Sequence, residues 1–412
     1  MGSVSHHFFN ERQHADGSRK GVPDGPKQMQ HYVNDDKLNI FRLPVEWDYL
    51  VAAPGQPLLA ERLGQYDDLM QSCLATGAYC ILDIHSYARW GDMHGNQIIA
   101  QGGPSTEQFV DLWTQLAKKY ATDEKVIMGI MNEPYGVDIQ IWAQVVQAAV
   151  TAIRGAGATK QMMLLPGTDY TNPALWVSDG SGAALTQIVN PGCSDSDTAC
   201  KYAGLIFDFH YYFGYDTECS NNGIENAWTP PLALMRQDPS NIRQGMVTKI
   251  GGGPHSQSCL TNVCQALDFM NENSDVYLGW TAWAAGAFTM ANAMFLLDDN
   301  GNDVPLMTQC FAGKAYGGLG PGSTAPGLGV SQGTSSGTGS PNAQGLVANE
   351  TGTSGASQIF GSGQPQTFAT EPNVTNSSST SKKSQSSKTC SNMNTASKPR
   401  RRRSHKLRSP EM

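Results

Sequence analysis

One pattern constrains the fold of this chain more than any other: short apolar runs alternate with longer segments of helical periodicity. The apolar runs span residues 39–44, 78–85, 126–133, 161–167, 205–210, 245–250 and 277–283. Segments 106–121 and 139–157 lie between some of these runs, and their apolar residues recur every three to four positions. Almost continuously apolar strands that alternate with helices are typical of a parallel sheet covered by helices.

The carboxyl ends of these predicted strands carry residues that a buried strand rarely contains. They are Arg42, His85, Asn132, Glu133, His210, Lys249 and Trp283. In a closed barrel the carboxyl ends of all strands meet at one face, where active sites lie. An open sheet would gather such residues only near one switch point, and no Gly-x-Gly-x-x-Gly loop follows any of the runs. We therefore predict an α/β fold of the (β/α)8 TIM-barrel type with a site at that face.

Composition divides the chain into a barrel domain, residues 21–319, and a Ser/Gly/Thr-rich tail, residues 320–412. Too few tail residues are apolar to offset the entropy lost on folding, so we expect the tail to be disordered. Residues 1–20 contain no convincing first strand, and SVSHHFFN is a poor substitute for one. We therefore expect the first strand to be missing or degenerate and the barrel to be open, with residues 3–10 as at best a makeshift strand.

Charge argues against several classes of partner. The tail holds 10 Lys/Arg and 3 Asp/Glu, which leaves 18 and 33 in the rest of the chain, a net charge of −15. So acidic a body is unsuited to nucleic acid or anionic membranes and suits a neutral ligand. The basic run at 400–403 is typical of a solvated tail, although it could contact phosphate or lipid. We also expect no membrane span.

Cysteines indicate an oxidising compartment. The body contains an even set of eight, Cys73, Cys80, Cys193, Cys200, Cys219, Cys259, Cys264 and Cys310, and Cys390 is left over in the tail. An even set fits disulfides and an extracellular protein. Their spacing does not match a zinc site, so we predict no metal. No apolar segment typical of a secretion signal is visible, and we expect the N-terminus to be truncated.

Several of these runs carry a family resemblance. FRLPVEWDYL, GAYCILDIHSYARW, GIMNEPYG, LIFDFHYYF and NSDVYLGWTAWAAGAF resemble, in order and in spacing, the fungal-type endo-β-1,4-glucanases (cellulases) of glycoside hydrolase family five. The resemblance extends from about Gly21 to Gly313. It implies a barrel that hydrolyses β-1,4-glucan with retention, using two glutamates about 5–5.5 Å apart and no cofactor. We expect the protein to be a monomer.

The resemblance also implies roles for individual residues. Glu133, in the Asn-Glu-Pro motif, matches the acid/base, and Asn132 the residue that binds the sugar 2-hydroxyl. Arg42 and His85 match residues that orient carboxylates and substrate. The matches in the cleft are His210, Tyr212 (aimed at the nucleophile), Trp283 (a sugar platform) and Tyr170 (in place of the usual tryptophan). We expect Trp47, Trp113 and Trp142 to pack in the core.

The same resemblance implies disulfides Cys73–Cys80, Cys219–Cys259 and Cys264–Cys310. A pair Cys193–Cys200 has no counterpart in the family, although its spacing equals that of Cys73 and Cys80.

Lys249 departs from the family pattern at a decisive position. The family's seventh strand normally ends Thr-Glu-Thr-Gly-Gly-Gly, and its glutamate is the nucleophile. Here Thr248, Lys249 and Ile250 precede Gly251 to Gly253, so Lys249 occupies the place of the nucleophile. An ammonium cannot form the glycosyl ester, and a cation there would lower the pKa of the acid. We expect the standard retaining reaction to be impaired.

Three hypotheses remain open. The chain is an endoglucanase by class, or a non-catalytic carbohydrate-binding protein on the same scaffold, or the non-functional product of a decayed gene. Under the first, Asp169, Glu46 or Asp216 could serve as an inverting base through a water molecule.

Overall fold

The protein folds as a barrel of parallel strands. Its computed structural model describes residues 25–213, 218–220, 223–285, 294–298 and 300–312, and the backbone of 3–5, 9–10 and 13–14. Seven strands follow one another in the sheet in chain order: β4 (Ile40–Val45), β5 (Tyr79–Ile84), β6 (Val126–Gly129), β7 (Met163–Pro166), β8 (Leu205–Tyr212), β9 (Gln244–Gly251) and β10 (Tyr277–Ala282). Every neighbouring pair among them is parallel.

A three-residue strand, β1 (Ser3–Ser5), joins the two ends of this sheet. Val4 is in register with Ala282 of β10, and Ser3 to Ser5 are in register with Ile40 to Arg42 of β4. The expectation of an open barrel with two unpaired edges was therefore wrong, whereas the expected degenerate first strand is confirmed. Parallel pairing uses backbone groups alone, so three residues without an apolar pattern are enough to bridge the gap.

A short hairpin follows β1. Its strands are β2 (Phe9–Asn10) and β3 (Gln13–His14), which pair antiparallel, and Phe9 is also in register with Val45 of β4.

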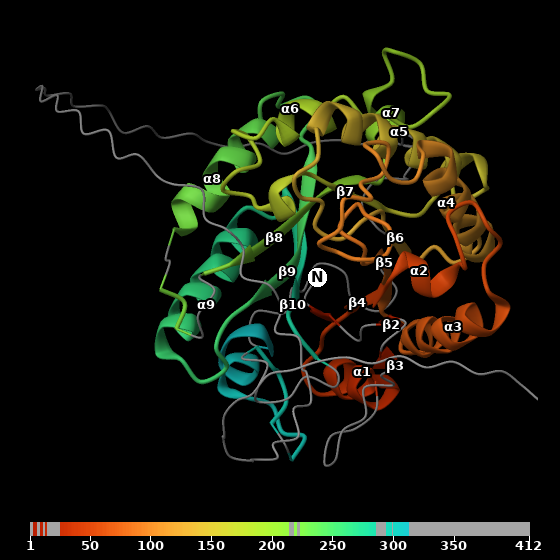
Figure 1. The fold of residues 1–412 in the computed structure, drawn as a ribbon. Helices are drawn as coiled ribbons and strands as arrows, with labels where there is room; N and C mark the ends of the chain where they lie inside the picture. Colours follow the sequence, from red (N-terminus) through yellow and green to blue (C-terminus); the bar gives the residue numbers. More distant parts are fainter. Residues whose placement is uncertain are drawn as a thin grey trace, which may run out of the picture. The chain divides into compact units, whose positions relative to one another are not determined.

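Helices surround the strands (Figure 1). The longer ones are α1 (Gly25–Asn34), α3 (Ala60–Ala75), α4 (Thr106–Tyr120), α5 (Ile139–Gly155), α8 (Ile224–Met235) and α9 (Gln257–Glu272). The shorter ones are α2 (Trp47–Leu50), α6 (Ser181–Leu185), α7 (Thr198–Tyr202), η1 (Asp169–Thr171) and η3 (Met307–Phe311). Helix α4 begins at a capping box formed by Ser105 and Gln108, and Asp138 caps α5.

Two apolar clusters make up the core. The larger lies between strands and helices and contains Trp47, Trp113 and Trp142, which confirms their expected packing role. The smaller draws one inward-facing residue from each of several successive strands: Ile40, Ile81, Ile127, Leu164, Ile206 and Met246. Side chains two residues apart share a face of a strand, so residues just beyond these also face the barrel interior. Arg42, Asp83, Asp208 and Thr248 stand at such positions.

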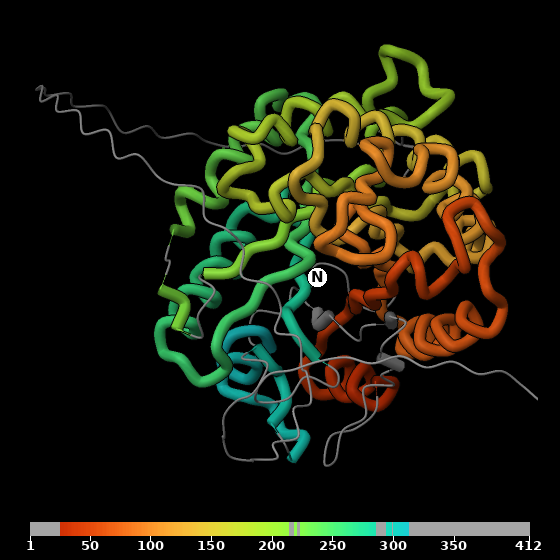
Figure 2. Tube along the Cα trace, viewed as in Figure 1, coloured from red at the N-terminus to blue at the C-terminus, as the bar shows by residue number. Residues whose placement is uncertain are grey.

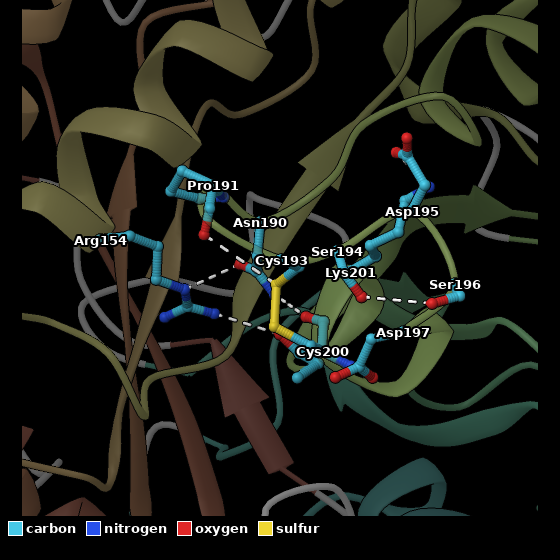
Figure 3. The surroundings of a disulfide bond; sticks show 11 residues. Arg154, Asn190, Pro191, Cys193, Ser194, Asp195, Ser196, Asp197, Cys200 and Lys201 are labelled. Atoms are coloured by element: carbon cyan, nitrogen blue, oxygen red, sulfur yellow. Dashed lines mark hydrogen bonds and ion pairs between the residues drawn. A yellow bond between two sulfur atoms is a disulfide. The ribbon is translucent and has the colours of Figure 1, made fainter.

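Four disulfides connect the loops and helices: Cys73–Cys80, Cys193–Cys200, Cys219–Cys259 and Cys264–Cys310. They include the three pairings that the resemblance implied. The fourth, Cys193–Cys200, closes a loop before β8 (Figure 3). Asn190 links it to the barrel body, because its Nδ2 donates to the carbonyl of Cys200 and its Oδ1 accepts from Arg154 Nε at 2.8 Å.

The predicted tail, 320–412, lies outside the described residues. Among the helices that are described, none is both long enough and apolar enough to cross a bilayer.

Candidate active site

An ion pair between Glu133 and Lys249 lies at the carboxyl ends of the strands. Lys249 Nζ donates to Glu133 Oε1 at 3.1 Å, and the Lys249 ammonium lies 4.0 Å from the centroid of the Trp283 ring. The Lys249 side chain is 3% exposed and that of Glu133 12%. Two opposite charges this close and this little hydrated attract each other strongly, and the attraction offsets part of the cost of burying them. Each of the two buried charges therefore has the other as its partner.

The local backbone explains how Lys249 reaches Glu133. Between Phe209 and His210 the pairing of β8 with β9 shifts register, so Phe209 is opposite Val247 but His210 is opposite Lys249. Such an irregularity re-aims side chains and breaks the strict alternation of faces. As a result both Thr248 and Lys249 contact residues of the site.

The glycines after Lys249 are required by close packing. A Cβ on Gly251 would lie 2.6 Å from the carbonyl oxygen of Trp283. One on Gly252 would lie 2.5 Å from Cys219 Sγ and 2.9 Å from Cys259 Sγ. The glycines therefore let β9 end against both the next strand and a disulfide, which fixes where Lys249 stands.

A chain of hydrogen bonds leads from Glu133 into the barrel. His210 Nδ1 bonds Glu133 Oε1 at 2.7 Å, and His210 Nε2 bonds Thr248 Oγ1 at 3.0 Å. The Thr248 hydroxyl donates to Asp208 Oδ1 at 2.5 Å. Glu133 itself has a left-handed backbone, with φ of 42°, which is costly for a residue with a Cβ and is typical of functional sites. The surrounding contacts hold it in that conformation.

A second network holds Asn132 beside Glu133. Arg42 Nη2 donates to Asn132 Oδ1 at 2.7 Å and lies 2.9 Å from Asp83 Oδ2. His85 Nδ1 bonds the same Asp83 oxygen at 2.7 Å. All four residues are buried. Within the described part of the chain, Asn132 Nδ2 and Arg42 Nη1 have no hydrogen-bond partner, so two buried donors remain unsatisfied.

The charges set the protonation of the site. Burial raises the pKa of Glu133, but the charge of Lys249 and the hydrogen bond with His210 outweigh it and hold that pKa far below its ordinary value. Burial lowers the pKa of His210, and burial together with the charge of Lys249 lowers that of His85 well below its usual range. Burial raises the pKa of Asp83 to about 6 despite the nearby Arg42. At neutral pH, Glu133 is thus ionised and His85 is neutral.

The structure brings most of the predicted residues together and leaves some apart. The Trp283 ring is nearly parallel to that of His85, with centroids 6.1 Å apart, but Trp283 is only 7% exposed. Tyr170 lies in η1, where its ring stacks on Tyr135 at 4.7 Å. Tyr212 ends β8, in register with Gly251. Their roles as sugar contacts remain predictions, and Asp216, a possible base, lies outside the described residues.

Sequence reasoning missed several residues of this site. Asp83 and Asp208 each stand two positions before a predicted site histidine, and both contact it or its neighbours. Arg89 was not predicted either. Its guanidinium lies 3.8 Å from the centroid of the Tyr135 ring and donates to the carbonyls of Tyr87 and Tyr135. The Asp-x-His spacing was a usable signal, because residues two apart on a strand share a face.

The fold and this buried polar layer define a class: (β/α)8-barrel proteins with a site at the carboxyl ends of the strands. The sequence profile of the family described as cellulase (glycosyl hydrolase family 5) matches residues 7–286. The chain therefore belongs to the cellulase family, glycosyl hydrolase family 5, as its sequence predicted.

Known proteins resemble the chain closely. Endoglucanase EG-II from Hypocrea jecorina is 47% identical over 305 residues, which cover 71% of this chain and 69% of that protein. Endoglucanase 1 from Saitozyma flava is 38% identical over 288 residues, which cover 68% and 79%. The crystal structure of Cel5A (EG2) from Hypocrea jecorina superposes with a TM-score of 0.68 at 41% identity and covers 76% of this chain and 98% of that one.

Proposed function

We propose that this chain binds β-1,4-glucan in an endoglucanase cleft in which Lys249 replaces the nucleophile and blocks retaining hydrolysis. The observation that carries the proposal is the buried contact of 3.1 Å between Lys249 Nζ and Glu133 Oε1. In a retaining enzyme the group opposite the acid/base is a carboxylate that attacks the sugar. A lysine ammonium has no free electron pair with which to attack.

The ion pair removes the second catalytic function as well. A general acid must hold a proton near neutral pH, and a neighbouring carboxylate normally raises its pKa to make this possible. Here the neighbour is a cation, so the pKa of Glu133 is lowered instead. Glu133 then has no proton to give to the glycosidic oxygen. Both halves of the two-glutamate reaction are lost through one residue.

The remainder of the cleft supports carbohydrate binding. Asn132 Nδ2 is a buried donor without a protein partner in the described residues, and a sugar hydroxyl is a suitable acceptor for it. Arg42 holds the Asn132 side chain in place through its carbonyl oxygen. One related structure, XacCel5A in complex with cellopentaose, is 26% identical and superposes with a TM-score of 0.63, covering 76% of this chain and 99% of that chain. Its name supports a β-1,4-linked glucose oligomer as the ligand here.

The four disulfides among the described cysteines also support an extracellular location. Disulfides persist in oxidising environments and are rare in reducing ones, and this chain forms four of them among its described cysteines.

Two measurements on the purified chain test the proposal. We expect calorimetry to detect binding of cellopentaose, weakened at least tenfold by Asn132→Ala, which removes the unsatisfied donor. We expect reducing-sugar release from carboxymethylcellulose to stay at the background of a heat-denatured sample. Clear turnover that Glu133→Gln abolishes would refute the block, and absence of cellopentaose binding would refute the retained cleft.

A further inference from the structure

A cluster of three potential metal ligands lies at the carboxyl end of α1, away from the Glu133–Lys249 pair. His31 is in the last turn of α1, Asp36 is in the connection to β4, and Asp303 belongs to the segment after β10. His31 Nε2 lies 3.1 Å from each carboxylate oxygen of Asp303 and 3.6 Å from Asp36 Oδ2. One donor atom from each of the three residues lies within 4.8 Å of the others.

Asp36 is the residue that protein contacts leave unexplained. Its side chain is only 9% exposed, and its Oδ2 has no hydrogen-bond partner among the described residues. A buried carboxylate oxygen without a donor is costly. Asp36 Oδ2 lies 3.6 Å from His31 Nε2, and donor atoms of all three residues lie within 4.8 Å of one another, so a cation bound between them would satisfy this oxygen.

The imidazole is oriented as metal ligands usually are. His31 Nδ1 bonds Asp35 Oδ2 at 2.6 Å, which holds the ring and directs Nε2 toward Asp36 and Asp303. A carboxylate on the far nitrogen of a ligating histidine is the usual arrangement in metal sites. A protonated imidazole would also pair with Asp35 and Asp303, but its contact of 3.6 Å with Asp36 Oδ2 is an ion pair too long for a hydrogen bond.

The spacing between the donors fits a shared ion. Ligands about 2.0–2.2 Å from one cation, at tetrahedral or octahedral angles, stand roughly 3.0–3.5 Å apart. The contact of 3.1 Å from His31 Nε2 to Asp303 falls within that range, and the contact of 3.6 Å to Asp36 lies just above it. One imidazole with two carboxylates suits a divalent transition metal such as Zn²⁺ or Mn²⁺ better than Ca²⁺, which prefers oxygen ligands alone.

We propose that His31, Asp36 and Asp303 bind a divalent transition-metal cation that ties the segment 294–312 to α1. Figure 2 shows this segment in cyan next to the red helix. His31 and Asp303 are 272 positions apart, so the ion would connect the chain after the last barrel strand to the helix after the first. The sequence prediction of no metal is revised by this proposal, because a spacing that long carries no recognisable motif. The role is structural and independent of the proposed sugar cleft.

The test uses the full chain without an affinity tag, stripped with EDTA and titrated separately with Zn²⁺, Mn²⁺, Ca²⁺ and Mg²⁺. We expect one Zn²⁺ or Mn²⁺ per chain by calorimetry. We also expect the Tm to rise by roughly 5 °C at a free metal concentration about 100 times the Kd, because the ion binds only the folded state. Ca²⁺ and Mg²⁺ should raise it less.

Variants separate this site from other metal-binding groups such as the N-terminal histidines. Asp36→Asn and Asp303→Asn should each weaken binding at least tenfold and abolish the metal-dependent rise in Tm. Asp68→Asn, which alters an exposed carboxylate on α3, should leave both unchanged. Without metal, Asp36→Asn should melt no lower than the wild type, because it removes an unsatisfied buried charge. No binding by the wild type, or binding that Asp36→Asn does not weaken, would overturn the proposal.

Discussion

Lys249→Glu should convert this chain into a hydrolase. The two side chains differ by one bond in reach, since the lysine nitrogen is five bonds from Cα and the glutamate oxygens are four. Lys249 Nζ now lies 3.1 Å from Glu133 Oε1. Withdrawal by one bond of about 1.5 Å would place the new carboxylate roughly 4.6 Å from that oxygen. This agrees with the separation of about 5–5.5 Å between the carboxyl groups of retaining glycosidases.

The expected increase in kcat can be estimated from the catalytic cost of lacking a nucleophile. Loss of a nucleophile costs on the order of 10⁶ in turnover in another hydrolase. A misplacement of 1 Å costs on the order of 10². We therefore expect kcat to rise at least about 10³-fold for Lys249→Glu even if the new carboxylate is imperfectly aligned. The like charge would also raise the pKa of Glu133, so the activity should follow a bell-shaped pH profile.

The assay is the release of dinitrophenol from an aryl β-cellobioside, because a good leaving group reports the attack itself. Lys249→Gln is the matched control: it removes the same charge and supplies no nucleophile, so we expect it to stay within about tenfold of the wild type. A covalent glycosyl adduct on residue 249, trapped by a 2-fluoro substrate and found by mass spectrometry, should form only in Lys249→Glu. Equal activities in the Glu and Gln variants would refute the assignment of position 249 as the nucleophile site.

Two further predictions concern stability, both measured by urea unfolding. Glu133→Gln should lower the free energy of unfolding by about 3–5 kcal/mol at pH 7, because it leaves Lys249 buried and unpaired. The folded-state pKa of Glu133 is depressed, so its stabilisation is complete above the unfolded pKa of about 4.3 and is lost as pH falls below it. The difference between variant and wild type should therefore shrink at pH 3, and a constant difference would contradict this. Gly252→Ala should cost about 1–3 kcal/mol by pressing on the Cys219–Cys259 disulfide, whereas Gly64→Ala, in open space on α3, should be neutral or stabilising.

The strands of the barrel could be predicted because each is long enough to show its pattern. Each of the seven predicted runs overlaps one strand of the sheet, and the ends differ by at most four residues; the run 126–133, for example, holds the shorter strand Val126–Gly129. Glu133, whose backbone is left-handed, lies four residues beyond the end of that strand. The strand Ser3–Ser5 was not predictable in the same way. Its pairing depends on backbone groups and on the neighbouring strands that flank the gap, and neither is visible in three residues.

The candidate site was only partly predictable, for a different physical reason. Polar residues that are unusual in a buried strand, such as Arg42 and Lys249, could be identified one by one from the sequence. The residues that hold them could be identified only through the Asp-x-His spacing, because Asp83 and Asp208 become necessary only when the strands are side by side. A buried arginine requires a carboxylate, and the sequence does not say which strand provides it. The part of the site that could not be predicted from single residues therefore depends on contacts between neighbouring strands.

Under the proposed function, a lysine at the position of the nucleophile would be compatible with this fold for the same reason that it would prevent catalysis. Two carboxylates held about 5 Å apart in a buried site repel each other, and that repulsion is what keeps one of them protonated and active. Exchanging one carboxylate for an ammonium turns the repulsion into an attraction and adds a favourable contact with the face of Trp283. Active sites commonly sacrifice stability for activity in this way. Under the proposed function, the Glu133–Lys249 pair would reverse that exchange, because the networks around Arg42 and His210 would surround two attracting charges in place of two repelling ones.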